Sequence, residues 1–446
     1  MRPPLRTLAA AGALGLAASA PAMGAWAPPQ RASTGPGDAH SPDVAVGGRG
    51  DAAAVWVQET GRRGRIVAST RRAGGAWSRP APVSSPGLSA IDPRVAVDPS
   101  GRIVAVWRQV VRTRVLQGRR QAVYVARARE RRPGGGWSAV ATLSDDRQKV
   151  GTPELAMDGR GVAIATWHWG TGTRAGSPGH VGEVQVAEKR PGSAWSRVRR
   201  ASDRGGCALD TRLPRAAAGA GGHAVVWWQC DQAGGRAAFD AIGRGPSPGA
   251  WSAPRRLPVR IAREQAVDLA VAPDGTVLGL SVVPARPPVA WRGPSPLGRA
   301  DSLGLTQLTV LLPPLAARHG GRPAVATASA AAVAAWISDS GLALVDPVLD
   351  NARVTAVDGP LRARSDVRVA ASAIGSAVAV ARSGGGVVAT LRAAGGDWAP
   401  IERISAAGAV EDAGVGIDAA GVAVAYWARR AGGRSVVERA ELAVAP

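Results

Sequence analysis

One apolar phrase recurs along the chain, and this repetition constrains the fold more than any other feature of the sequence. The phrase reads GDAAAVWVQ at 50–58, GRIVAVWRQ at 101–109 and GVAIATWHW at 161–169. Later copies stand at 222–229, from 275, up to 336, from 375 and from 421. Successive copies are about 45 to 61 residues apart, a period that indicates a fold assembled from one small repeated unit.

Each unit has the pattern of four short strands. A second apolar run, such as RVAVDPSG or LAVAPDG, directly precedes each copy, and an Asp- and Gly-rich turn separates the two. Strand, tight turn and strand are together typical of a β-hairpin. A third run follows (RIVASTRR, AVYVARARE), and a Trp-Ser phrase such as GAWSRPAPVS closes the unit. The runs are nearly continuous, as in strands buried on both faces, so each unit is predicted to be a four-stranded antiparallel meander.

Eight such units can be counted, and meanders repeated in this way predict an all-β fold. The expected architecture is a β-propeller of eight four-stranded blades, with seven blades as the alternative. The order of the phrases resembles the WD-repeat arrangement, in which each sequence repeat begins with the outer strand of the preceding blade. This resemblance covers nearly all of the chain after residue 22 but concerns architecture alone, because the Gly-His pair and terminal Trp-Asp of that family are absent.

The two ends of the repeat array complement each other. The last unit ends at RSVVERAELAVAP (434–446) without a Trp-Ser phrase, whereas the unattached phrase GAWAPPQRAS stands at 24–33, before the first unit. We therefore predict that an N-terminal strand pairs with the last blade and closes the ring, with a loose tail at 24–33 as the alternative. Closure of this kind also covers two sheet edges that would otherwise invite aggregation.

The first residues predict export. MRPPLR carries two arginines, TLAAAGALGLAASA is a short apolar run, and small residues follow, which is the pattern of a cleavable signal peptide. We assign 1–22 to the signal peptide and 23–446 to the propeller, with an uncleaved N-terminal anchor as the alternative. No later apolar run approaches the length of a membrane span. The mature chain is expected to be a secreted, extracytoplasmic monomer without a membrane span.

The chain has two cysteines, Cys207 and Cys230, which bracket the first two strands of the fourth unit. In a hairpin those two ends lie side by side, within the Cα separation of about 7 Å that a disulfide requires. Exported proteins mature in an oxidising compartment. We therefore predict that Cys207 and Cys230 form a disulfide.

Tryptophan dominates the aromatic residues, with 15 Trp against one Phe and two Tyr. Six share one position in the second strand of their units: Trp56, Trp107, Trp167, Trp227, Trp336 and Trp427. Six share a position in the closing phrase: Trp26, Trp77, Trp137, Trp195, Trp251 and Trp398. One large aromatic side chain at a fixed place in each unit indicates packing between blades. Trp169 and Trp228 break this pattern at the ends of second strands, and with His168 they are candidates for ligand contact.

The chain is strongly basic, with 55 Lys and Arg against 33 Asp and Glu and a formal net charge of +22, which favours anionic partners. The loops between second and third strands are long only in units two and three, where they carry Arg112, Arg114, Arg119, Arg120 and Arg174. Because loops carry function more often than strands, these arginines predict a basic ligand-binding face, with a solvated basic rim as the alternative. A nucleic-acid partner is not expected, because the charge is spread along the chain and no aromatic stacking platform interleaves with it.

One charged position can be followed through the units, seven residues before the aligned glycine. It reads Asp43, Arg94, Glu154, Arg215, Asp268, Ala324 (after a one-residue adjustment), Arg368 and Gly414. Five successive units alternate in sign, which predicts a ring of salt bridges at the mouth of the central channel. Arg368 has no acidic neighbour at the adjacent aligned positions. The unpaired share of charge on Arg94, Arg215 and Arg368 is therefore predicted to attract a carboxylate or phosphate ligand.

Motifs for metal or cofactor chemistry are missing from the sequence. The histidines lack metal-binding spacing, and neither a G-x-S-x-G elbow nor a phosphate loop occurs, so no metal or cofactor is predicted. The aspartates that recur in the turns are predicted to form them through hydrogen bonds to the backbone: Asp98, Asp158, Asp274 and Asp418. Sialidase propellers carry the box S-x-D-x-G-x-x-W, but here the interval from Asp to Trp is longer and the preceding Ser is missing. The resemblance to sialidases is one of architecture, and their catalytic residues cannot be carried over.

These features predict a binding or scaffold module rather than an enzyme, with an anionic glycan, a cell-envelope polymer or a protein as its partner. The alternative is a sialidase-like glycoside hydrolase with divergent motifs. The two hypotheses differ at the centre of the ring. An enzyme requires a cluster of acids there, whereas a binding module requires basic and aromatic side chains.

Overall fold

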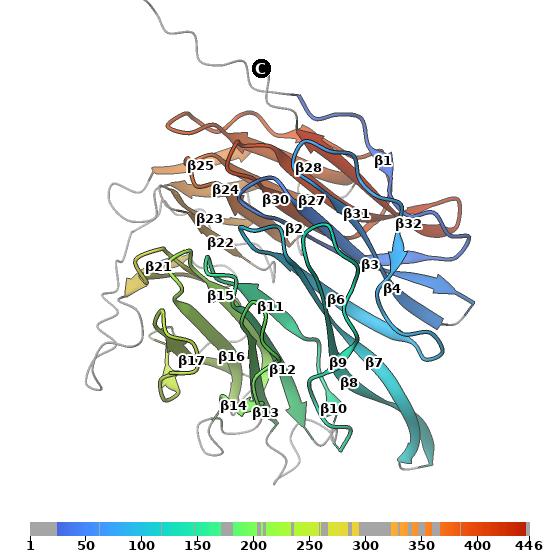
Figure 1. Cartoon of the computed structure of the whole chain (residues 1–446). Coiled ribbons are helices and arrows are strands. Elements are labelled where there is room, and N and C mark those ends of the chain that lie inside the picture. The colour runs from blue at the N-terminus through green and yellow to red at the C-terminus, as the bar shows by residue number, and fades with distance from the viewer. Residues whose placement is uncertain are drawn as a thin grey trace, which may run out of the picture.

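Eight antiparallel sheets stand around a common axis and form an eight-bladed β-propeller (Figure 1). The structure is a computed structural model that describes residues 25–61, 63–116, 118–147, 149–170, 182–202, 207, 211–232, 236–257, 259, 266–283, 288–293, 323–328, 331–337, 341–346, 353–358, 366–383 and 385–442. Every regular element of these residues is a β-strand. The predicted fold class is confirmed, with eight blades rather than seven.

In the first four blades the strands follow chain order from the channel to the rim. Blade 1 contains β2 (Ala39–Val46), β3 (Ala52–Thr60), β4 (Arg63–Arg71) and β5 (Ala81–Pro82). Blade 2 contains β6 (Ala90–Val97), β7 (Ile103–Leu116), β8 (Arg119–Arg131) and β9 (Ala141–Thr142). Blade 3 has an interrupted inner strand, β10 (Lys149–Val150) and β11 (Glu154–Met157), followed by β12 (Ala163–Gly170), β13 (Glu183–Lys189) and β14 (Arg199–Arg200). Blade 4 contains β15 (Thr211–Ala218), β16 (Ala224–Gln232), β17 (Arg236–Arg244) and β18 (Arg255–Arg256).

The last four blades follow the same order, except that the chain ends meet in blade 8. The described part of blade 5 contains β19 (Ala266–Val271), β20 (Val277–Val282) and β21 (Val289–Gly293). Blade 6 contains β22 (Ala324–Ala328), β23 (Ala331–Ile337), β24 (Gly341–Asp346) and β25 (Arg353–Asp358). Blade 7 contains β26 (Val367–Ala371), β27 (Ala377–Ser383), β28 (Gly386–Arg392) and β29 (Glu402–Arg403). Blade 8 contains β30 (Val410–Ile417), β31 (Ala423–Ala431), β32 (Arg434–Leu442) and, outermost, β1 (Gln30–Arg31).

The N-terminal strand closes the ring, as the sequence predicts. Strand β1 pairs antiparallel with β32, and Gln30 lies opposite Arg439. Trp26 forms a further bridge to Leu442. The backbone N–H of Ala27 donates to the carbonyl oxygen of Glu441 at 2.8 Å. Blade 8 is therefore completed by residues from both ends of the repeat array.

A repeated serine fixes the outer strand to the third strand in five of the blades. In blade 8 the hydroxyl oxygen of Ser33 accepts the backbone N–H of Val437 at 3.1 Å. The same bond recurs at the end of the outer strand in four other blades, through Ser84, Ser144, Ser202 and Ser405. The phrase GAWAPPQRAS thus matches the other closing phrases in its serine as well as in its tryptophan.

The two sets of tryptophans have different environments. The second-strand set is at most 2% exposed and forms the centres of the cores between blades, as predicted. In the closing-phrase set, Trp251 is 8% exposed, and the other five are half-buried. Several of these, including Trp77, Trp137 and Trp195, pack against the rims of the same cores. Each Trp position therefore contributes to packing between neighbouring blades, from the centre or from the edge.

The turn aspartates stabilise the hairpins between first and second strands. Asp98 Oδ1 accepts the backbone N–H groups of Ser100 and Arg102, at 2.8 and 3.0 Å. Asp158 and Asp418 make the equivalent bonds in blades 3 and 8. Within the described ranges no helix is present that has the length and apolar character needed to cross a membrane.

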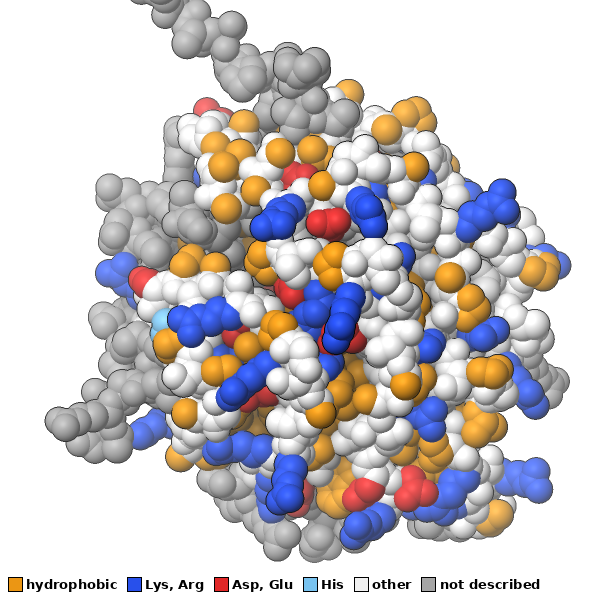
Figure 2. All heavy atoms as spheres, in the orientation of Figure 1, with side chains coloured by type: hydrophobic (Ala, Val, Ile, Leu, Met, Phe, Trp, Pro, Cys, Tyr) orange, Lys and Arg blue, Asp and Glu red, His pale blue; other side chains and the backbone are white. Residues whose placement is uncertain are grey.

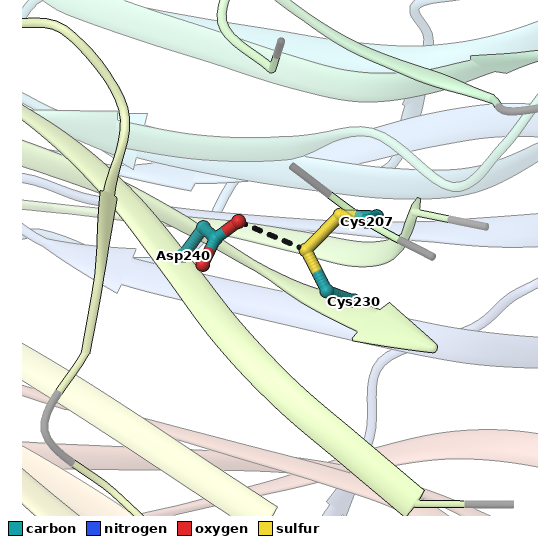
Figure 3. A group of neighbouring side chains, drawn as sticks. All are labelled: Cys207, Cys230 and Asp240. Carbon is teal, nitrogen blue, oxygen red and sulfur yellow. Dashed lines mark hydrogen bonds between the residues drawn. A yellow bond between two sulfur atoms is a disulfide. The ribbon is translucent and has the colours of Figure 1, made fainter. Parts of the chain in front are cut away.

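A disulfide joins Cys207 to Cys230 in blade 4, with the Cα atoms 4.9 Å apart (Figure 3). Asp240 of the neighbouring strand β17 places its Oδ2 atom 3.1 Å from the Sγ atom of Cys230. Asp240 is also paired with Arg256 of β18. The disulfide, Trp228 and apolar side chains of blades 3 and 4 share one core. The covalent bond thus anchors the segment that enters blade 4 to the end of its second strand.

Candidate ligand site in the central channel

The inner strands bring six charged side chains together around the channel. They are the members of the aligned position that carry charge, and we call them the charge ring: Asp43, Arg94, Glu154, Arg215, Asp268 and Arg368. All six are half-buried. Figure 2 shows basic and acidic side chains next to one another at the centre of one face, where the inner strands of Figure 1 converge.

Proline bulges in the inner strands position several of these charges. Ser41, Asp92 and Leu213 each directly precede a proline and have φ angles of 51°, 53° and 49°. The register of the inner strand shifts at each of these places, just before Asp43, Arg94 and Arg215. A positive φ at a non-glycine residue is costly and tends to occur at functional sites, and a bulge turns a side chain in a new direction.

Blade 3 has a break of its own at the same level, because β10 ends at Val150 and β11 begins at Glu154, directly after Pro153. Four consecutive units therefore share a proline followed by a charged residue: Pro42-Asp43, Pro93-Arg94, Pro153-Glu154 and Pro214-Arg215. The charges were predicted from the sequence, but this dipeptide was not recognised as a feature of the inner strands. A search for proline at the start of the inner strands would have located the bulges.

Arg94 and Glu154 form the strongest pair of the ring. Arg94 Nε donates to Glu154 Oε2 and its second terminal nitrogen donates to Oε1, both at 3.1 Å. Their side chains are 25% and 22% exposed. This bidentate geometry links blade 2 to blade 3 and is the favoured arrangement of guanidinium with carboxylate.

Asp43 and Asp268 hold the next blade through its backbone. Asp43 Oδ2 accepts the N–H of Val95 at 2.8 Å, and Asp268 Oδ2 accepts the N–H of Val325 at 2.9 Å. Asp268 is also 3.8 Å from a terminal nitrogen of Arg215. The same type of contact therefore joins blade 1 to blade 2 and blade 5 to blade 6.

The acids of the ring differ in their affinity for a proton. Burial raises the pKa of Asp43 and of Asp268, although Arg94 and Arg215 respectively act against it. Burial also disfavours ionisation of Glu154, but the charges of Arg94 and Arg215 outweigh it and lower the pKa of this carboxyl. Neighbouring acids in one channel thus have pKa values displaced in opposite directions.

Arg368 is the exception in the ring, because its guanidinium has no ion pair or hydrogen bond with any residue in the described ranges. Burial is the main cause of the raised pKa values of Asp43, Asp268 and Asp412, and the Arg368 charge opposes burial at all three. The same charge helps to lower the pKa of Glu154. Arg368 therefore acts on carboxyls of four other blades, as expected for a cation close to the axis.

A cavity of about 290 Å³ lies beside the ring along the inner strands of blades 4 to 6. Its wall includes Glu154, Arg215, Asp268, Trp227 and Thr327. Acids and arginines alternate in the channel. It therefore matches neither the cluster of acids expected of an enzyme nor the basic and aromatic lining expected of a binding module.

The basic loop of blade 2 lies away from the ring, on the extended β7–β8 hairpin. Arg112 is paired with Asp146, its Nε atom 2.8 Å from Oδ2. Arg114 is half-buried and Arg120 is exposed. The side chain of Arg119 and the whole of Arg174 lie outside the described residues. The structure therefore brings only part of the predicted basic face into view, and that face stays a prediction.

The aromatic ligand candidates divide between surface and core. The Trp169 Nε1–H group donates to Asp145 Oδ1 at 3.2 Å, and both Trp169 and His168 are half-buried near the end of β12. Trp228 was wrongly assigned, because its side chain is 1% exposed and has no free face for a ligand. Trp227 and Trp228 are neighbours on β16 and point to opposite faces of the blade, so each enters a different interblade core.

Comparison with protein-family models finds no match for this sequence, and neither does comparison with curated proteins. Among solved structures, a protein of unknown function from Dyadobacter fermentans has a TM-score of 0.45 and 10% identity, over 96% of this chain and 99% of that one. A polysaccharide lyase has a TM-score of 0.49 and 10% identity, over 91% and 90%. A Trypanosoma rangeli sialidase in complex with sialic acid has a TM-score of 0.46 and 11% identity, over 83% of this chain and 56% of that one. Similarities at this level assign neither ligand nor activity.

Proposed function

We propose that the protein is an exported binding module that recognises an acidic saccharide in its central channel, with Arg368 as the residue that holds the acid group. The observation that carries this proposal is the half-buried guanidinium of Arg368, which has no partner among the described residues. A charge withdrawn from water is costly unless it is paired. An anionic group of a ligand would supply the missing partner.

The surrounding acids define which anion fits. Asp43 uses Oδ2 on the backbone of Val95, while its Oδ1 atom accepts no hydrogen bond from a described residue. Carboxyl oxygens of this kind accept hydroxyl groups but repel a bare phosphate or sulfate ion. A ligand that carries both a carboxylate and several hydroxyls satisfies both kinds of residue. An acidic saccharide has this combination of groups.

The channel also contains a cavity large enough for one sugar unit, although Arg368 is not among the residues that line it. The cavity beside Arg215 and Asp268 measures about 290 Å³, and one water molecule takes up about 30 Å³ in the liquid. Trp227 borders this cavity but is only 2% exposed, so the proposed contacts with a sugar rest on the charged residues of the wall. Export and action outside the cytoplasm belong to the same proposal and rest on the signal-like residues 1–22.

Calorimetric titration of the purified mature protein tests the site, with glucuronate as the probe and glucose as its neutral match. We expect glucuronate to bind and glucose not to bind. Arg368→Gln should weaken glucuronate binding at least tenfold, and raising the salt concentration should weaken it further. The matched control is Arg63→Gln, which removes an exposed charge at the first residue of β4. Equal affinity of wild type and Arg368→Gln would contradict the proposal. If glucuronate affinity falls in Arg120→Gln instead of Arg368→Gln, the ligand binds at the basic loops.

A glycoside hydrolase is the second candidate, because one observation favours it. Asp43, with a raised pKa, interacts electrostatically with Glu154, whose pKa is lowered, and such a pair can divide the roles of proton donor and carboxylate. In that reaction Asp43 would protonate the leaving glycosidic oxygen as its bond to the anomeric carbon breaks. Glu154 would take a proton from the water that adds at that carbon. Both Glu154 oxygens are held by Arg94, which ranks this candidate second.

Release of a fluorescent aglycone from glucuronide and sialoside substrates separates the two candidates. Turnover that is abolished by Asp43→Asn, with glucuronate binding retained, would establish the hydrolase. Binding without turnover supports the binding module.

A further inference from the structure

A second charged region lies at the outer rim, at the turns that follow the third strands of blades 1 to 3. Arg71, at the end of β4, pairs with Ala52, the first residue of β3. Arg119, at the start of β8, pairs instead with Leu116, the last residue of β7. The turns after β4 and β8 are therefore at the opposite end of the blades from the tip of the basic β7–β8 hairpin. The charge ring lies on the inner strands and is separate from both.

Two cavities open along these turns on consecutive blades. The cavity between blades 1 and 2 measures about 310 Å³, and its wall includes Asp51, Arg71, Arg72, Arg131, Arg132 and Gly134. The cavity between blades 2 and 3 measures about 590 Å³, and its wall includes Glu130, Arg132, Gly136, Trp137, Lys189 and Ser193. Arg132 lines both. We call the two cavities together the turn groove.

The turn groove holds two unpaired cations. Arg72 and Arg132 are exposed, and within the described residues neither guanidinium forms an ion pair or hydrogen bond. Arg72 reaches over blade 2, since a Cβ atom on Gly134 would lie 2.8 Å from its Nη2 atom. Gly134 has a φ of 70°, so the turn favours glycine for its backbone as well as for this close approach.

The other charges of the groove are largely engaged. Glu130 is bound by Arg102 at 3.1 Å and by Lys189 at 3.0 Å. Arg71 is paired with Glu441 at 2.6 Å, and Arg131 donates to Thr70 and to the carbonyl oxygen of Gly135. Asp51 is the remaining acid on the described walls. The groove therefore keeps an excess of positive charge after its own pairs are formed.

We propose that the turn groove binds a linear polyanionic polysaccharide, whose successive acid groups meet Arg72 and Arg132. A polymer is favoured over a single ion because the two cations lie on consecutive blades and Arg132 borders both cavities. A sugar chain is favoured because Trp137 and the glycine-rich turns offer an apolar surface and open backbone beside the charges. This site is independent of the channel and of the function proposed for it.

A galacturonate decamer is the probe for this site, measured by calorimetry at 50 and 200 mM NaCl. We expect the double variant Arg72→Gln/Arg132→Gln to weaken binding at least tenfold at the lower salt concentration. The slope of log affinity against log salt should fall by about one for each ion pair lost, as for other polyelectrolytes. The matched control is Arg63→Gln/Arg430→Gln, which removes two exposed charges from the opposite ends of blades 1 and 8 and should change affinity less than twofold.

Three results would overturn the proposal. Equal losses in the groove variant and the control would show non-specific attraction to a basic surface, and unchanged affinity in the groove variant would remove the site. Binding of a single-stranded DNA of equal charge as tightly as the decamer would exclude saccharide recognition. Arg368→Gln should leave decamer binding unchanged while glucuronate binding falls, so the two proposals fail separately. A thermal melt of each variant verifies folding.

Discussion

The charge ring and the turn groove differ in whether their arginines have acidic partners. In the ring, Arg94 and Arg215 face acids of the next blade along the chain. In the groove, Arg72 and Arg132 have no partner among the described residues and extend into solvent. An exposed guanidinium keeps its hydration and needs no counter-ion, whereas a half-buried one does. Arg368 departs from this rule, which makes a lone cation in the channel stronger evidence for a ligand than a lone cation at the rim.

The excess positive charge of the protein lies outside the charge ring. The ring contains three arginines and three acids, so it adds nothing to the formal net charge of +22. The excess must lie on other surfaces, of which the turn groove is one. The two proposals therefore assign attraction of a polyanion and selection of a ligand to different parts of the molecule.

The largest effect is expected from Arg94→Ala. This change leaves Glu154 half-buried without its bidentate partner, and loss of one member of a buried pair costs about 3–5 kcal/mol. Because both side chains are about a quarter exposed, we expect about 3 kcal/mol in the free energy of unfolding from urea titration. The double variant Arg94→Gln/Glu154→Gln should recover much of this loss. A loss below about 1 kcal/mol would mean that water already replaces the pair.

Arg215→Ala should destabilise less. Arg215 is 3.8 Å from Asp268 and acts on Glu154 only at longer range. We expect about 1–2 kcal/mol, between an exposed and a buried ion pair. The same urea titration measures it, with Arg63→Gln as a surface control. If Arg215→Ala costs as much as Arg94→Ala, the ring is a cooperative network rather than a set of pairs.

The pH dependence of the stability of the Asp43→Asn variant tests the raised pKa of the Asp43 carboxyl. Since the folded-state pKa of Asp43 is raised, the folded protein binds more protons than the unfolded chain at a pH between the two pKa values. The stabilising effect of the neutral form is complete below the unfolded pKa, near 3.8, and is lost as pH rises through the folded pKa. Asparagine mimics the neutral carboxyl, so the variant should match wild type at pH 3 and be more stable at pH 7. Greater stability of wild type at pH 7 would show that Arg94 stabilises the charged form.

The smallest effects on stability belong to the unpaired arginines. We expect Arg368→Gln to change the free energy of unfolding by less than about 1 kcal/mol, and Arg72→Gln/Arg132→Gln to stay within about 0.5 kcal/mol, as is usual for surface changes. Urea titration beside the binding measurements separates stability from recognition. A loss above about 2 kcal/mol for Arg368→Gln would reveal a partner inside the protein and remove the main support for the channel site.

The internal repeat explains why so much of the fold could be predicted. The four-strand pattern returns in eight units, so weak signals such as the position of Trp56 become strong by repetition. The same alignment placed Asp43, Arg94, Glu154 and Arg215 on equivalent positions of inner strands, and the structure brings them around one channel. It also identified the phrase around Trp26 as a missing outer strand, which the pairing of β1 with β32 confirms.

Other features could not be predicted because they depend on neighbours that are distant in sequence. Trp228 follows a core tryptophan, and only the packing of blades 3 and 4 showed that it also faces a core. The turn groove went unnoticed because RR-x-G reads as a solvated turn until the walls of adjacent blades are known. The proline bulges were readable as a dipeptide, but their effect on direction requires the backbone.

The amino-acid sequence by itself determined the four-stranded blade and the way the ring closes, because strand period, turn residues and repeat length are local properties that recur in each unit. It favoured eight blades over seven, and the tertiary structure decided between the two. Only the tertiary structure decided which charges are paired. Glu154 and Arg94 are 60 positions apart in the chain, and the lack of a described partner for Arg368 depends on carboxyls from four other blades. Ion pairing depends on separation in space and on access of water, and neither is defined until the blades have closed around the axis.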